Sequence, residues 1–241
     1  MIVTIAWREL KNLFLSPLAW TVMAITQLIC AVIFLAGLWS YLDKPDPVGV
    51  TASVVTPVFA WAAVLLLFVV PLLTMRVVAE ERRNKTLVLL FSAPVSMTEI
   101  VLGKYLGLVL FLISMLLVVM LMALSLMVGT TLDFGLIGAQ ALGLLLLVSS
   151  FTAVGLYLST RTESPAVAAI STFGILLLLW LLEFLRNFLH QDVLAYLSII
   201  GHFMSFLEGV FNTADVAYYL LFTAMFLVLS IRHLDTKRLG V

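Results

Sequence analysis

Long stretches without a charged side chain are the feature that most limits what this chain can fold into. The first of them runs from Leu18 to Leu42 and contains no Asp, Glu, Lys or Arg. At a rise of ~1.5 Å per residue, a helix of this length crosses a hydrocarbon core of ~30 Å with some tilt. Because the backbone inside lipid must satisfy its own hydrogen bonds, the run predicts a transmembrane helix.

The same pattern recurs along the sequence and predicts an all-α polytopic membrane protein. Hydrophobic residues make up 63% of the chain and charged residues 11%, whereas soluble domains are ~25% charged. A soluble fold is therefore excluded, and so little chain lies outside the apolar runs that no soluble catalytic domain fits. We expect one transmembrane domain over residues 1–241 with spans at about 18–42, 54–75, 105–128, 134–158, 166–189 and 216–231.

The first seventeen residues have the pattern of an interfacial helix. Ile2, Ile5, Leu10 and Leu13 recur at helical spacing, and polar side chains fall on the other face. Such amphipathic helices lie in the plane of the membrane surface. The residues expected to anchor residues 1–17 at this surface are Trp7, Arg8, Glu9 and Lys11.

Positive charge is distributed unequally between the two sides of the predicted membrane protein. Six spans place both termini on one side, and that side carries eleven of the thirteen Lys and Arg residues, namely Arg8, Lys11, Arg76, Arg82, Arg83, Lys85, Lys104, Arg161, Arg232, Lys237 and Arg238. Lys44 and Arg186 fall on the other side. By the positive-inside rule the termini are cytoplasmic. The zero net charge and the lack of any other basic patch give no indication of a nucleic-acid partner.

Residues 76–104 form the longest polar interruption between predicted spans. A charged run from Glu80 to Lys85 leads into an apolar run, and Pro94 ends the helical pattern. Ser96 and Glu99 then have the spacing of a capping box, which begins a new helix. We expect two helices joined at a sharp corner, which either dock a soluble partner or form an ordinary loop with a surface helix.

Within the segment 190–215, the run from Val193 to Phe211 is apolar but carries His202 and Glu208. A charge at the centre of a membrane helix costs roughly 2.5–3.5 kcal/mol. We therefore expect a pair of short helices on the outer side that dips into the membrane or lies on it, rather than a further span.

Glu183 and Arg186 lie three residues apart near the end of the fifth predicted span, so they share a helix face. Two interpretations stay open. The two side chains pair with each other and reach the outer interface, or they form a polar patch at a cavity or a subunit interface.

Common catalytic motifs are absent from the sequence. Gly103-Lys104 is followed by Tyr105, and Thr98 stands where a phosphate-binding loop has its first glycine, so the chain is not expected to bind ATP, to carry catalytic residues or to hold a metal itself. Gly103 and Gly107 fit a close helix contact, a pattern that is common in membrane helices.

The order of motifs resembles the permease subunit of an ABC transporter of the type-2 exporter class. The matching residues are Arg8-Glu9-Leu10, Ser16-Pro17, Glu80-Glu81-Arg82-Arg83, Thr86-Leu87, Leu90, Pro94 and Gly103-Lys104. Pro71, Thr74-Met75-Arg76 and the segment from His202-Phe203 to Glu208-Gly209 are similar to the gliding-motility-associated permeases. Lys85 replaces the usual glycine before the Thr-Leu pair, and Val88 replaces the glutamate that often follows it.

The resemblance implies a subunit of the bacterial inner membrane that moves a substrate outward. A separate ATP-binding subunit would bind ATP and Mg²⁺, and a second permease chain would complete a homodimer or heterodimer. Membrane lipids surround the spans, and an accessory protein on the outer face is a further implied partner. The coupling segment that docks the ATP-binding subunit would include Glu80, Glu81, Arg82, Arg83, Thr86, Leu87, Leu90, Phe91 and Pro94.

Two other classes of function stay open from the residues alone. A secondary transporter or channel usually has internal repeats and charged or broken helices at the midplane, and neither is evident here. A membrane anchor that recruits a larger complex without transporting anything has no distinguishing sequence signal.

Overall fold

The computed structural model describes residues 1–44, 47, 49–84, 95–189 and 198–238, without the side chains of 185–189. Every element in this part of the chain is helical. The elements are α1 (Ile2–Leu15), α2 (Pro17–Asp43), the π-helix η1 (Thr51–Val55), α3 (Thr56–Thr74), α4 (Ala79–Arg83), α6 (Met97–Ser125), the 3₁₀ turn η2 (Leu126–Val128), α7 (Phe134–Arg161), α8 (Pro165–Leu189), α10 (Ile199–Leu207) and α11 (Thr213–Arg238).

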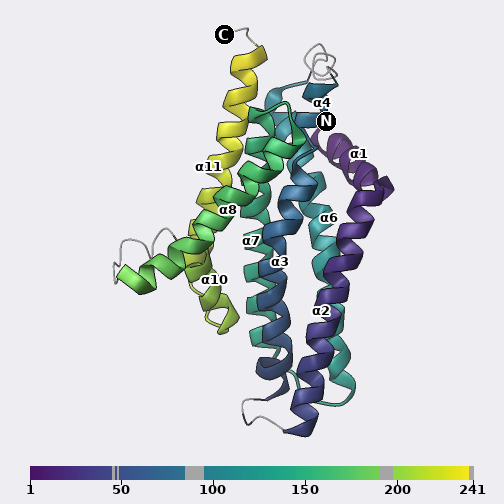
Figure 1. Cartoon of the computed structure of the whole chain (residues 1–241), viewed down its shortest axis with the longest axis vertical. Helices are drawn as coiled ribbons and strands as arrows, with labels where there is room; N and C mark the ends of the chain where they lie inside the picture. The colour runs from purple at the N-terminus through teal and green to yellow at the C-terminus, as the bar shows by residue number, and fades with distance from the viewer. Residues whose placement is uncertain (45–46, 48, 85–94, 190–197, 239–241) are drawn as a thin grey trace.

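Six of these helices are long and apolar enough to cross a membrane, and they form an elongated bundle. They are α2, η1 with α3, α6, α7, α8 and α11, which confirms the predicted all-α polytopic membrane fold. In Figure 1, α1, α4 and the last turns of α11 gather at one end of the bundle, here called the terminal end. The loops after α2 and α6 lie at the opposite, distal end.

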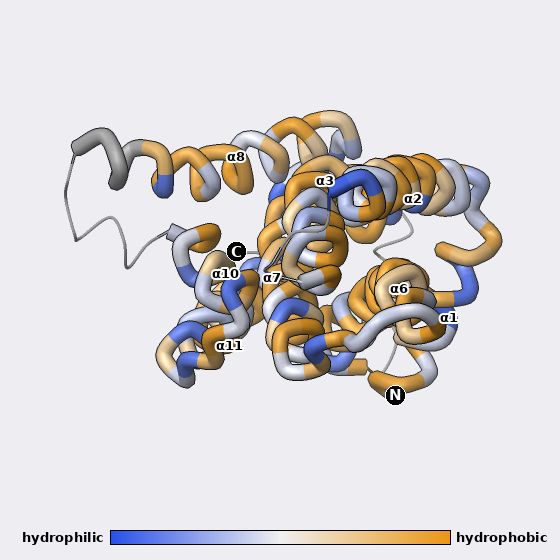
Figure 2. Tube along the Cα trace, turned by 90° about the horizontal axis from the view of Figure 1, so that it is seen from below, coloured by the Kyte–Doolittle hydropathy of each residue, from blue (hydrophilic) through white to orange (hydrophobic). Residues whose placement is uncertain are grey.

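The centre of the bundle is built from α3 and α7. Most residues in the apolar stretches of these two helices are buried within the protein, whereas only a small share of those in α2, α8 and α11 is buried. Seen from the distal end in Figure 2, α3 and α7 lie between α8 on one side and α2 with α6 on the other. Because apolar side chains outside the bundle are solvated by lipid, the peripheral helices need no polar outer face.

The corner between α1 and α2 follows from one dipeptide. Pro17 occupies the first position of α2, where its missing N–H costs nothing. Ser16 before it has an extended backbone with ψ 122°, as expected for a residue that precedes proline. In Figure 1, α1 therefore turns away from α2 and lies across the terminal end.

The capping box predicted at the start of the third span is present. The Ser96 hydroxyl accepts a hydrogen bond from the Glu99 backbone N–H, and the Glu99 carboxylate accepts one from the Ser96 backbone N–H at 3.1 Å. As a result α6 begins at Met97 and continues unbroken past residue 105, where the apolar run begins. Residues 85–94, including Pro94, lie outside the described part of the chain.

The second half of the segment between α8 and α11 contains a short helix. α10 begins at Ser198, whose hydroxyl accepts a hydrogen bond from the Gly201 N–H, and ends before Gly209, which has a φ of 80°. In Figure 1, α10 stops short of the distal ends of α2 and α3. Residues 190–197, where the partner helix of the predicted pair would begin, are outside the described residues.

The last span differs in length from the run 216–231. α11 extends from Thr213 to Arg238, because Arg232, His233 and Asp235 end the apolar run without ending the helix. Its terminal turns project beyond the neighbouring helices in Figure 1.

Gly103 and Gly107 bring α6 into backbone contact with α1 rather than with another span. A β-carbon at position 103 would meet Ile5 Cβ at 2.7 Å, and one at position 107 would meet Glu9 Cβ at 2.7 Å and the Ala6 carbonyl oxygen at 2.9 Å. Helices approach this closely only where glycine removes the side chain. These two glycines therefore set how deeply α1 sits against α6.

We predict that Gly107→Ala lowers the free energy of unfolding in detergent by roughly 1–3 kcal/mol, because the added methyl group overpacks the contact with α1. Gly174→Ala on α8 is the matched control, since a β-carbon there meets nothing within 4 Å. Both changes give the same gain in helix propensity. Equal unfolding free energies for the two variants would contradict the prediction.

Candidate functional site

The terminal end contains a buried lysine at the point where four elements meet. Lys104 lies on α6, and 1% of it is exposed. Its Nζ donates to the Val77 carbonyl oxygen at 2.8 Å and to Glu81 Oε1 at 2.7 Å. A lysine this buried is stable only when its charge is paired and its protons are bonded. Lys104 therefore holds α4 and the turn before it against α6.

Glu9 brings α1 into the same cluster. Its carboxylate lies 3.7 Å from Lys104 Nζ, and 8% of the residue is exposed. Arg8 lies at the rim, with Nη2 3.9 Å from Glu81 Oε1. We call Glu9, Val77, Glu81 and Lys104 the lysine junction. It joins α1, the α3–α4 turn, α4 and α6 through one ammonium group.

α7 holds α4 from the other side. The Ser159 hydroxyl accepts hydrogen bonds from the backbone N–H groups of Val78 and Ala79, each at 3.1 Å. These are donors at the start of α4 that have no partner inside the helix. Arg82 Nη1 donates to the Thr160 carbonyl oxygen at 3.0 Å, and its Nε lies 3.6 Å from Glu163 Oε1.

The predicted coupling residues fall into three groups. Glu81 and Arg82 are anchored as described, whereas Glu80 and Arg83 are exposed. Thr86, Leu87, Leu90, Phe91 and Pro94 lie outside the described residues. The described part of the chain thus fixes both ends of this segment, Asn84 next to α4 and Val95 next to the cap of α6.

The predicted surface anchors of α1 do not act as one group. Trp7 is 69% exposed, and Arg8 and Lys11 are exposed as well. Glu9 instead points into the protein toward Lys104, so the prediction that it lies on the membrane surface is wrong. From the sequence we did not predict that Lys104 is buried in an ion pair, although a lysine beside a glycine at the start of an apolar run could have suggested one.

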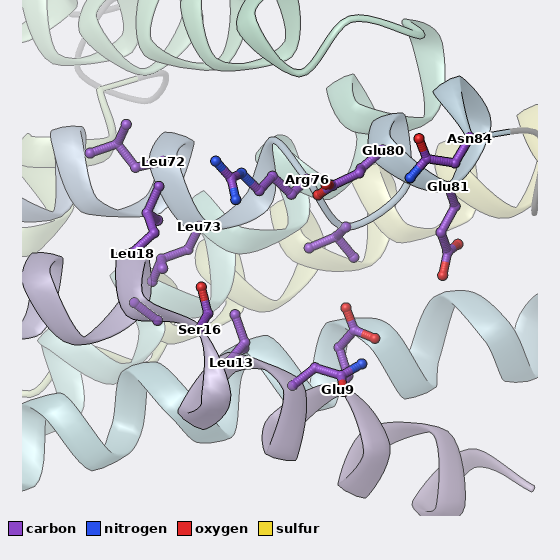
Figure 3. Close-up of a pocket in the computed structure, with 13 residues that line it drawn as sticks. Glu9, Leu13, Ser16, Leu18, Leu72, Leu73, Arg76, Glu80, Glu81 and Asn84 are labelled. Carbon is purple, nitrogen blue, oxygen red and sulfur yellow. The ribbon is translucent and has the colours of Figure 1, made fainter.

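A groove adjoins the lysine junction. One wall consists of the end of α3 and α4, and the other consists of α1 and the start of α2. Figure 3 shows Glu80, Glu81 and Asn84 on the first wall and Glu9 on the second, with their polar groups directed into the space between. Leu13, Leu18, Leu72 and Leu73 line its apolar end.

His202 and Glu208, which the sequence singled out, have different surroundings. His202 Nδ1 lies 2.6 Å from Asp215 Oδ1, and the His202 ring stacks on Tyr218 with centroids 4.1 Å apart. This pair connects α10 to α11. Glu208 is exposed at the end of α10. No group of three or more His, Cys, Asp or Glu side chains suited to a metal occurs within the described ranges.

Gln140 was not singled out from the sequence but is fully buried on α7. Its amide nitrogen donates to Thr56 Oγ1 at 2.6 Å and to the Leu207 carbonyl oxygen at 2.9 Å. It therefore links the start of α3 to the end of α10.

The predicted pair of Glu183 and Arg186 is only half described. Glu183 is partly buried near the end of α8, and the Arg186 side chain lies outside the described residues.

The comparison with protein families decides the class of this protein. The model of the family described as ABC-2 type transporter matches residues 1–211. The chain belongs to the ABC-2 type transporter family. It is accordingly a multi-pass membrane permease subunit of an ABC transporter, a transmembrane component whose family implies an ATP-binding partner. The family match does not distinguish subgroups, so the resemblance to the gliding-motility-associated permeases stays a prediction. The search of curated proteins found no match.

We predict that Lys104→Met lowers the free energy of unfolding by roughly 3 kcal/mol, because it leaves Glu9 and Glu81 without their buried counter-charge. Lys11→Met on the exposed face of α1 is the matched control and should change stability little. Unfolding of both purified variants in mixed detergent micelles measures the difference. A Lys104 variant as stable as the Lys11 variant would show that the junction does not hold the terminal end together.

Proposed function

We propose that this ABC-2 permease is part of an ATP-driven exporter, and that residues 80–94 dock into a separate ATP-binding subunit. The observation that carries the proposal is the lysine junction. It ties α4, which precedes residues 85–94 in the sequence, to α1 and α6.

The contacts give a route by which a displacement of this segment reaches the spans. A force applied at residues 85–94 acts on α4, where Glu81 is bonded to Lys104 of α6. Ser159 and Arg82 connect the same element to α7. Separating the buried charges would leave an uncompensated ion, so the elements of the junction move together.

The charge distribution supports a cytoplasmic location for the terminal end. The cations of α1, α4 and the last turns of α11 gather there, while Lys44 lies at the distal end. By the positive-inside rule both termini and the docking segment face the cytoplasm. We therefore place the chain in a bacterial inner membrane, with α10 on the outer side.

The remaining partners follow from the same proposal. ATP and Mg²⁺ bind in the partner, since the sequence lacks a phosphate-binding loop. The helices α2, α8 and α11, which are the least buried of the spans, offer apolar surface both to lipid and to a second permease chain, identical or related. An accessory protein on the outer face would meet the distal end.

The docking role predicts a specific loss of the partner. Replacing residues 85–94 by a flexible Gly-Ser linker of equal length should abolish co-purification of the co-expressed ATP-binding subunit, because the linker has no fixed surface to dock. The same replacement at residues 127–131, which are exposed in the distal loop, is the control and should leave the complex intact.

Retention of the ATP-binding subunit by the 85–94 variant would overturn the proposed docking site. The rate of ATP hydrolysis by the reconstituted complex then distinguishes a transporting permease from a passive membrane anchor. A coupled permease should change the hydrolysis rate of its partner, and Lys104→Met should reduce that change in any complex that still assembles. A passive anchor leaves the rate at that of the isolated ATP-binding subunit.

A further inference from the structure

Along one face of the segment that leads from α3 into α4, the polarity and charge of the side chains change every four residues. Leu72, Arg76, Glu80 and Asn84 all line the groove beside the lysine junction. Figure 3 shows this order along the groove, from the apolar end near Leu18 to the polar end near Asn84. The wall thus runs from apolar to cationic, then to anionic and finally to neutral polar.

The two charges in the middle of this face are available to a ligand. Within the described residues, the side chains of Arg76 and Glu80 make no hydrogen bond and no ion pair. The other two carboxylates of the groove, Glu9 and Glu81, are already engaged by Lys104. A ligand therefore meets one uncommitted cation and, one turn further from the spans, one uncommitted anion.

The groove lies at the level where a span ends and α1 crosses the terminal end. α3 ends at Thr74, just before Arg76, so the apolar end of the groove adjoins the spans and the polar end adjoins α4. Its volume is about 270 Å³, slightly below the ~300–1,000 Å³ of pockets that enclose a whole drug-sized ligand. It can hold a headgroup while acyl chains stay outside among the spans.

We propose that this groove binds the headgroup of a zwitterionic phospholipid with a primary ammonium group, such as phosphatidylethanolamine. The Arg76 guanidinium takes the phosphate, because its planar fork matches phosphate oxygens. Glu80 takes the ammonium, with the Asn84 side chain beside it. Leu72 and Leu18 cover the glycerol and the first carbons of the acyl chains.

The order of the residues favours this class of lipid over others. In a phospholipid the acyl chains, the phosphate and the ammonium follow one another outward from the membrane, as do Leu72, Arg76 and Glu80 along the groove. An anionic lipid without an ammonium group leaves Glu80 without a partner and adds negative charge near Glu9 and Glu81. A choline headgroup has no N–H to donate to the carboxylate.

The site shares Glu80, Glu81 and Asn84 with the segment proposed to dock, but its lining residues all belong to the permease. Lipid binding can therefore be measured on the purified chain without the ATP-binding subunit, and its failure is distinguishable from a failure of the docking proposal. A lipid in it would also contact α1 and α4 together, since Asn12 of α1 and Glu80 of α4 both line the groove. It would thus bridge two of the elements that the lysine junction joins.

Native mass spectrometry of the purified full chain with added phosphatidylethanolamine tests the proposal. We expect Arg76→Gln and Glu80→Gln each to weaken binding roughly tenfold, the loss of one charge-assisted contact. Arg83→Gln, an exposed change outside the groove, is the matched control and should bind like the unaltered chain. Binding by Arg76→Gln equal to that by Arg83→Gln would overturn the site.

Reversing the charge at Glu80 tests the site through a change in lipid preference. A variant that merely failed to fold would not gain affinity for the second lipid. Glu80→Lys should bind phosphatidylglycerol more tightly than phosphatidylethanolamine, the reverse of the unaltered chain. An unchanged order of the two lipids would overturn the assignment of Glu80 to the ammonium.

Soluble glycerophosphoethanolamine should not displace the lipid at equal concentration, and displacement would show a site for the headgroup alone. Thermal unfolding of each variant in lipid-free detergent checks that the fold is kept.

Discussion

The terminal end of this permease depends on the ammonium group of Lys104. It is buried, and its partners come from the α3–α4 turn, from α4 and from α1. Removing such a charge from water costs several kcal/mol, which only good geometry and full hydrogen bonding recover. The elements that supply its partners are therefore held in one arrangement, and α1 is part of the bundle rather than a loosely attached surface helix.

Glycines at the helix contacts allow these elements to approach closely enough for this arrangement. Gly107 lets Glu9 approach α6, and Gly155 on α7 similarly leaves room for the Thr74 side chain at the end of α3. In lipid, packing and interhelical polar contacts replace the hydrophobic effect as the reason why helices associate. In the half of the bundle nearer the distal end, α10 is likewise held by a few polar contacts among apolar side chains. These contacts come from Gln140 and from the pair of His202 and Asp215.

Local signals in the sequence predicted the elements well, and long-range contacts were the part that they missed. Ser96 and Glu99 are three residues apart, so their capping box could be identified without knowing the fold. The corner after α1 is set in the same local way by Pro17 and the extended backbone of Ser16. The lysine junction, by contrast, joins residues that are far apart along the chain, and the residues next to each of them in the sequence give no sign of the contact. For this reason Glu9 was predicted to lie on the membrane surface. Ser159 and Gln140 were missed for the same reason, because their partners lie on other helices.

An all-α membrane fold with six spans, an amphipathic start and a polar break between the second and third spans follows from the amino-acid order alone. These properties follow from hydrophobicity, helix length and local capping, which depend only on neighbouring residues. The packing of the helices, by contrast, establishes which charges are buried together, which helices are central, and that Leu72, Arg76 and Glu80 face a groove against α1. Those outcomes depend on how helices pack, and packing is set by the shapes of surfaces that are distant in sequence.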